Sequence, residues 1–220
     1  MKFSPISFDP QKTCGMPHVL KVAFPLIMAS AGHALNLFCD RMMLGRYSAE
    51  AVAAAMPSGL TSFTISCIFL GTVGYVNSFV AQYTGAGEQK RVGLSIWQGV
   101  FLALFGGLFM ATGWFWGGWL MTQFGHAEAV LQQEIVYFKL LSIFAWIPLL
   151  IAAFSSFWSG RGLTMTIMIV NFIMVFSNIP FNYAFIYGNW GAPELGIRGA
   201  AYGTILSGLV GLCAFLILFF

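Results

Sequence analysis

Long apolar runs separated by short polar stretches make up most of this 220-residue chain. A helix needs about 20 such residues to cross roughly 30 Å of hydrocarbon. The runs are continuous, whereas membrane β-strands are segments of about ten residues with alternating polarity. The pattern therefore predicts an all-α polytopic membrane protein with six transmembrane helices. The expected spans lie near 19–40, 52–83, 93–122, 129–158, 163–187 and 199–220.

The first part of the chain differs from the rest. Residues 1–18 contain Pro5, Pro10 and Pro17 and few apolar residues, and they do not resemble a cleaved signal peptide. We expect residues 1–18 to form an N-terminal segment and residues 19–220 to form one transmembrane bundle.

The positive charges are distributed unevenly between the two sides of the expected bundle. An even number of spans places both termini on one side, and cytoplasmic loops carry the excess of Lys and Arg. The N-terminal side holds Lys2, Lys12, Lys21, Lys90, Arg91 and Arg161, and the other side holds Arg41, Arg46 and Arg198. We therefore expect a multi-pass protein of the cell (inner) membrane with a cytoplasmic N-terminus.

Composition agrees with this prediction and excludes other classes of protein. The chain is 59% hydrophobic and only 8% charged, whereas soluble domains are about 25% charged. The hydrophobic content excludes a disordered chain. A net charge of +3 does not indicate nucleic-acid binding. The sequence has no Walker A, HExxH or GxSxG motif, so we expect no enzymatic activity.

Polar residues inside the first span are the first functional candidates. An ionisable group in a membrane helix is costly and is a functional candidate by default. His33, Asn36 and Asp40 are three and four residues apart, which places them on one helical face. Asp40 could serve function, or it could end the helix at the interface and pair with Arg41. Glu134 in the fourth span is expected to be solvated or interfacial.

The fifth span carries three amides on one face. Asn171, Asn178 and Asn182 are seven and four residues apart. They could bond to one another and to a helix backbone, since an unsatisfied buried polar group costs about 1–3 kcal/mol. They could instead line a wet cavity with Asp40, where oxygen ligands suit Na⁺ or a proton relay. Thr204 in the last span could join either arrangement, and spacing alone leaves both open.

Prolines and glycines are expected to shape the helices. Pro25 and Pro180 precede polar residues in their own helices, and a proline removes one backbone hydrogen bond. We expect both to bend their helices. The segments 113–117 and 199–203 each begin and end with glycine, a pattern suited to close helix packing in membranes.

Several short motifs occur in order between residues 25 and 204. They are Pro25-Leu26-Ile27, Asp40, Gly45-Arg46, 51–55, 82–88, Asn178-Ile179-Pro180-Phe181-Asn182, 187–188, 191–196 and 199–204. Together and in this spacing they resemble the first lobe of the multidrug and toxic compound extrusion (MATE) transporters.

The resemblance implies a function and a site. It implies antiport of organic cations or other amphipathic compounds against Na⁺ or H⁺, with no cofactor besides that coupling ion. The positions of Asp40, Asn178, Asn182 and Thr204 would form the cation site, with Na⁺ at Asp40 and Asn178, and the first helix would repack around Pro25.

Three positions depart from the family pattern. Asn182 stands where some members have Asp, so a two-carboxylate relay is not expected. His33 stands where the family has Gln, and Arg41 where it has Thr. His33, Asn36 and Asn171 remain candidates for lining the cavity.

The resemblance covers only one lobe, because family members have twelve spans in two six-helix lobes. The expected partners are therefore drug-like small molecules, the lipid bilayer and a second lobe, supplied by a C-terminal continuation or by a dimer partner. Nucleic acid is not expected. Two alternatives stay open: a flippase for lipid-linked precursors, and a non-transporting truncated or assembly subunit.

Overall fold

The computed structural model describes residues 16–219, which form a helical bundle with no strand in that range. Residues 1–15 of the expected N-terminal segment lie outside the described part. The helices are α2 (Met16–Tyr47), α3 (Ala49–Gly74), α4 (Val76–Gly85), α5 (Gln89–Ala111), α6 (Gly113–Thr122), α7 (Glu128–Ile143), α8 (Trp146–Ser159), α9 (Thr164–Tyr187) and α10 (Ile197–Phe219), with one 3₁₀ turn at Asn189–Gly191. The predicted all-α class is confirmed.

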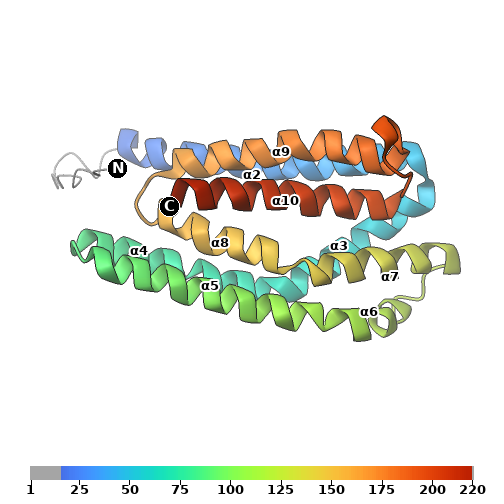
Figure 1. The fold of residues 1–220 in the computed structure, drawn as a ribbon, viewed down its shortest axis with the longest axis horizontal. Helices are drawn as coiled ribbons and strands as arrows, with labels where there is room; N and C mark the ends of the chain where they lie inside the picture. Colours follow the sequence, from blue (N-terminus) through green and yellow to red (C-terminus); the bar gives the residue numbers. More distant parts are fainter. Residues whose placement is uncertain (1–15, 220) are drawn as a thin grey trace.

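The helices run along the long axis of the bundle, and the loops gather at its two ends (Figure 1). α9 packs against both α2 and α10. Three pairs of consecutive helices each form one interrupted helix: α3 with α4, α5 with α6, and α7 with α8. We call the end with the loops at 123–127 and 188–196 the distal end. The opposite end carries the loops at 86–88 and 160–163.

Five stretches of helix are long and apolar enough to cross a membrane, and the bent pair α7 and α8 makes a sixth. The pair bends by 42°. The second and third spans are interrupted at Tyr75 and Thr112. The first helix runs on to Tyr47, past the end expected near residue 40.

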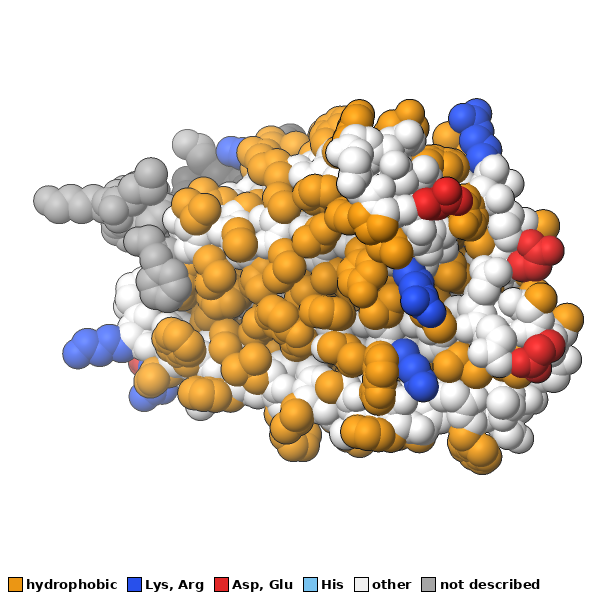
Figure 2. Space-filling model, turned by 45° about the vertical axis from the view of Figure 1, so that its right-hand side comes forward, with side chains coloured by type: hydrophobic (Ala, Val, Ile, Leu, Met, Phe, Trp, Pro, Cys, Tyr) orange, Lys and Arg blue, Asp and Glu red, His pale blue; other side chains and the backbone are white. Residues whose placement is uncertain are grey.

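The surface of the bundle is apolar along its sides. Large side chains such as Phe115 and Ile217 are 85% and 78% exposed. Hydrophobic side chains cover the middle of the face in Figure 2, and acidic side chains gather at its right-hand end. Apolar sides with charged ends are what a bilayer requires of a bundle that spans it. The chain is a multi-pass membrane protein.

Glycine allows α10 to lie directly against α9. A Cβ on Gly199 would lie 2.3 Å from the backbone oxygen of Phe185, and one on Gly203 would lie 2.0 Å from Oδ1 of Asn182. Neither position has room for a side chain. This close approach places α10 beside the amides of α9.

Candidate functional site

A buried polar cluster joins α2 to α9 near the distal end. Asp40 is 5% exposed, and Asn178 and Asn182 are fully buried. Nδ2 of Asn182 donates hydrogen bonds to Oδ1 of Asp40 and, at 2.7 Å, to Oδ1 of Asn178. The fold therefore brings together two residues that are 142 positions apart in the sequence.

The two amides owe their common direction to local geometry. Asn178 and Asn182 are four residues apart on α9 and so lie on the same face of that helix. Thr204 approaches from α10, where its hydroxyl donates to the backbone oxygen of Ala200 at 3.1 Å. The same hydroxyl lies close enough to the Asp40 carboxylate to interact with it. The cluster thus contains carboxylate, amide and hydroxyl oxygens from three helices.

Two atoms of the cluster are buried without a hydrogen-bond partner: Nδ2 of Asn178 and Oδ1 of Asn182. The amide group of Asn182 places its N–H groups between the oxygens of Asp40 and Asn178, where a cation would be attracted. If this amide rotated by half a turn, its unpaired oxygen would face the same two oxygens. Three oxygen ligands of this kind fit a hard cation such as Na⁺.

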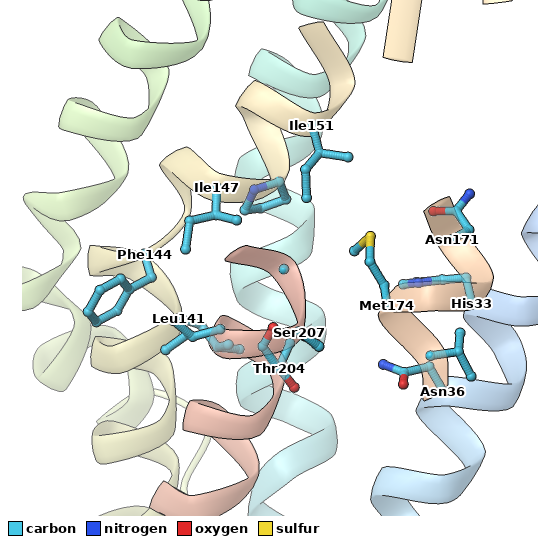
Figure 3. Close-up of a pocket in the computed structure, with 14 residues that line it drawn as sticks. His33, Asn36, Leu141, Phe144, Ile147, Ile151, Asn171, Met174, Thr204 and Ser207 are labelled. Atoms are coloured by element: carbon cyan, nitrogen blue, oxygen red, sulfur yellow. Dashed lines mark hydrogen bonds between the residues drawn. The ribbon is translucent and has the colours of Figure 1, made fainter. Parts of the chain in front are cut away.

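A cavity of about 200 Å³ lies beside this cluster and opens between α2, α7, α8, α9 and α10 (Figure 3). His33 and Asn36 from α2 and Asn171 from α9 face Leu141 and Phe144 across it, with Thr204 of α10 between them. The complete lining is His33, Asn36, Leu141, Phe144, Ile147, Pro148, Ile151, Asn171, Met174, Val175, Thr204, Ile205, Ser207 and Gly208.

The cavity walls are mainly apolar, with a few polar groups in them. One of these groups, Oδ1 of Asn36, is buried without a partner. The break between α7 and α8 supplies Phe144 and Ile147. Among the described residues that line the cavity none is Lys or Arg. Such a lining can take an amphipathic molecule, and Thr204 in this lining lies near Asp40.

Arg41 lies next to the cluster and points into the bundle. A Cβ on Gly59 of α3 would lie 3.5 Å from Nη2 of Arg41 and 3.8 Å from Cε1 of Tyr137 of α7. Nη1 of Arg41 is buried without a partner. The ion pairs within residues 16–219 do not include one between Arg41 and Asp40.

The expectation for Glu134 is wrong. Its side chain is fully buried, and its Oε1 lies 2.7 Å from Nδ1 of His126. Its Oε2 is buried without a partner. Sequence reasoning missed this pair because His126 lies in the loop before α7, and the spacing of eight residues matches no helical contact.

The two prolines lie within helices, and their bending of these helices stays a prediction. Pro25 lies inside α2 and Pro180 inside α9. Near Pro25, the hydroxyl of Thr164 at the start of α9 donates to the backbone oxygen of Val22 at 3.0 Å. This contact holds the first part of α2 against α9, and Pro180 lies between the two buried amides.

Comparison with known proteins gives a consistent match. The MatE family model matches residues 25–184. The chain is 31% identical over 194 residues to the probable multidrug resistance protein NorM of Thermotoga maritima. It is 32% identical over 192 residues to the multidrug resistance protein NorM of Vibrio cholerae.

These matches cover most of this chain but only part of the relatives. They include 88% of the chain and 42% of the Thermotoga protein, and 86% and 41% for the Vibrio protein. The chain therefore spans less than half the length of these curated relatives.

Solved structures agree in fold. A multidrug resistance MATE family transporter in an outward-facing conformation superposes with a TM-score of 0.84 at 20% identity, over 92% of this chain and 44% of that one. A MOP superfamily transporter from Pyrococcus furiosus superposes with a TM-score of 0.80 at 19% identity, with the same shares covered.

Proposed function

The chain belongs to the MatE family, and from this membership we propose that it forms the amino-terminal lobe of a secondary active multidrug transporter. The transported compounds are organic cations or other amphipathic molecules, exchanged against Na⁺ or H⁺. Relatives at about 30% identity carry the name multidrug resistance protein, which supports this substrate class.

One observation carries the coupling role: the buried Asp40 carboxylate bonded to Asn182. An isolated charge is costly inside a membrane, and a proton or Na⁺ at Asp40 would neutralise it. Without the ion, the N–H groups of Asn182 donate to the oxygens of Asp40 and Asn178. A bound ion takes the place of these N–H groups, so the amide of Asn182 rotates. The bond between α2 and α9 is then lost, and α2 can move relative to α9. Pro25 gives α2 a point at which to bend.

The substrate would occupy the cavity beside the cluster. Its apolar walls accept the hydrophobic part of a drug, and His33, Asn36 and Asn171 offer polar contacts. Thr204 lines the cavity, and its hydroxyl is near enough to Asp40 to interact with it. A bound substrate and a bound ion would therefore act on the same side chain of α10, which supports competition between them.

A second six-helix lobe would complete the transporter, as a continuation of the chain or as a dimer partner. Transporters built from repeats bind substrate between the repeats and move one against the other. The length of the relatives supports this view, since the chain spans about 42% of the Thermotoga protein. We place the protein in the cell (inner) membrane with its N-terminus in the cytoplasm, because Lys and Arg are more frequent on that side.

Replacement of Asp40 tests the coupling role. We expect Asp40→Asn to abolish cation-driven drug efflux from cells or proteoliposomes that contain the complete transporter, because the neutral amide cannot exchange a proton or attract Na⁺. Glu128→Gln is the matched control, since this exposed carboxylate accepts a hydrogen bond from Gln132 on its own helix. Membrane abundance of both variants is measured by immunoblot.

Efflux by Asp40→Asn at the wild-type rate, at equal abundance, would contradict the coupling role of this residue. Absence of drug efflux from the wild-type transporter would contradict the proposed function as a whole.

A further inference from the structure

We propose that Glu134 is a second proton-binding carboxylate of this lobe and that His126 loads it from the distal end of the bundle. The inference rests on the proposed function, because it assigns these two residues a part in proton-coupled transport. Three observations support it: Glu134 is buried, its partner His126 is half-exposed, and Oε2 of Glu134 has no hydrogen-bond partner.

The pair spans the boundary between solvent and interior. The side chain of Glu134 is 0% exposed and that of His126 is 39% exposed, with Nδ1 and Oε1 at 2.7 Å. A buried carboxylate is costly unless it is paired and hydrogen-bonded. Glu134 has this bond on one oxygen only, because its Oε2 is buried without a partner.

His126 faces open space on its other side. It lines a depression of about 540 Å³ together with Phe124 and residues of α3 between Val52 and Thr61. A histidine ring can take up a proton on one nitrogen and give one up from the other. Because His126 lies in the loop at the distal end and its side chain is 39% exposed, a proton from the aqueous phase at that end can reach its ring.

The transfer needs no other reactant. In the tautomer with hydrogen on Nδ1, a proton from water binds Nε2 and the Nδ1 proton moves to Oε1 of Glu134. Glu134 becomes a neutral carboxylic acid, and the ring is left with its hydrogen on Nε2. The imidazole of His126 thus passes one proton from solvent to the interior of the bundle.

Glu134 is also placed to influence the Asp40 site. Tyr137 follows one turn later on α7, and residues three apart lie on the same helical face. Tyr137 is close enough to Asp40 and Arg41 to be affected by both charges. Protonation of Glu134 removes a negative charge one helical turn from this group.

Among the acidic side chains of α7 and of the helices that pack against it, Glu134 is the buried one, so we assign the proton-binding role to it. Helix α6, which packs on the same face, carries none within Gly113–Thr122. Besides the buried Tyr137 of α7 and Arg41 of α2, which lies near it, the other titratable groups on α7 and on the helices that pack against it are Glu50, Cys67, Lys90, Arg91, Glu128, Lys139, Arg198, Tyr202 and Cys213. Each of these is exposed or half-buried, whereas Glu134 is fully buried.

Two substitutions of His126 separate a proton-transfer role from a structural one. His126→Lys gives Glu134 a positively charged partner that holds its proton through neutral pH, and His126→Gln gives it a neutral polar partner. Losing a positioned proton-transfer group costs about 10²-fold or more in rate. We expect both variants of the complete transporter to slow proton-driven efflux by about 10²-fold, with Glu128→Gln unchanged.

Wild-type efflux by His126→Lys together with a lower thermal midpoint for His126→Gln would overturn the proposal, because the pair would then be structural only. A second measurement does not depend on transport. Infrared difference spectra of the purified protein between alkaline and acidic buffer should contain a carboxylic acid band that Glu134→Gln removes and Glu128→Gln retains. An unchanged band in Glu134→Gln would also overturn it.

The two measurements also distinguish this inference from the proposed function. If the wild-type protein moves no drug but the Glu134 band is present, the proposed function fails and Glu134 still binds a proton. If the wild-type protein transports and Glu134→Gln does so at the same rate, only the inference fails.

Discussion

Gly203→Ala is expected to break the Asp40 cluster without removing any of its polar atoms. The added Cβ would lie 2.0 Å from Oδ1, 2.9 Å from Cγ and 3.2 Å from the backbone nitrogen of Asn182. The amide has little freedom to move aside, because its other end is bonded to Asp40 and Asn178. Either Asn182 leaves Asp40, or α10 moves away from α9.

The expected cost follows from two opposing effects. Overpacking a buried site costs about 1–3 kcal/mol. Alanine is favoured over glycine inside a helix by about 1 kcal/mol, which offsets part of that loss. We therefore expect Gly203→Ala to lower the free energy of unfolding by up to about 2 kcal/mol and to impair cation-driven efflux.

The assay is unfolding of the purified protein in detergent, with Gly71→Ala as the matched control. Gly71 lies inside α3, is exposed, and has no atom within 4 Å of its added Cβ, so its substitution should leave stability unchanged or slightly higher. Gly203→Ala should cost less when Asn182→Ala removes the clashing atoms, since neighbouring substitutions are not additive. Equal stability of Gly203→Ala and Gly71→Ala would refute this reasoning.

Three further substitutions test the packing around the site, each by the thermal midpoint of the purified protein. Gly117→Ala should destabilise by about 1–3 kcal/mol, because its Cβ would lie 2.4 Å from the ring of Phe138; a wild-type midpoint would show that this contact relaxes freely. Thr164→Val should cost about 1 kcal/mol through its lost bond to Val22, with Thr164→Ser restoring stability. Tyr187→Phe removes a hydrogen bond of 2.7 Å to the backbone oxygen of Met43 on α2 and should destabilise the protein by a similar amount. An unchanged midpoint would show that the Tyr187 hydroxyl bonds to water instead.

The expected spans depend on hydrophobic length, which is a local property of the chain. Continuous apolar runs predict helices, and α9 and α10 lie where two of these runs predict them, while α2 runs on past its predicted end. The breaks at Tyr75 and Thr112 could not be predicted in this way, because neither position is a proline.

Side chains on one helix could also be related by spacing alone. Asn178 and Asn182 share a face because they are four residues apart, and they bond to each other in the structure. Spacing could not say whether Asp40 would meet them, since 142 residues separate it from Asn182. The sequence therefore left an interfacial helix end and a buried site as equal alternatives.

The sequence by itself determined the fold class and the polar faces, because helical periodicity and apolar length act over a few residues. Only the tertiary structure decided which faces meet. It placed Asn182 against Asp40, and it buried Glu134 beside His126 where solvent was expected. Burial and pairing depend on which helices become neighbours, and close approaches such as that of Gly203 to Asn182 exist only once the bundle has assembled.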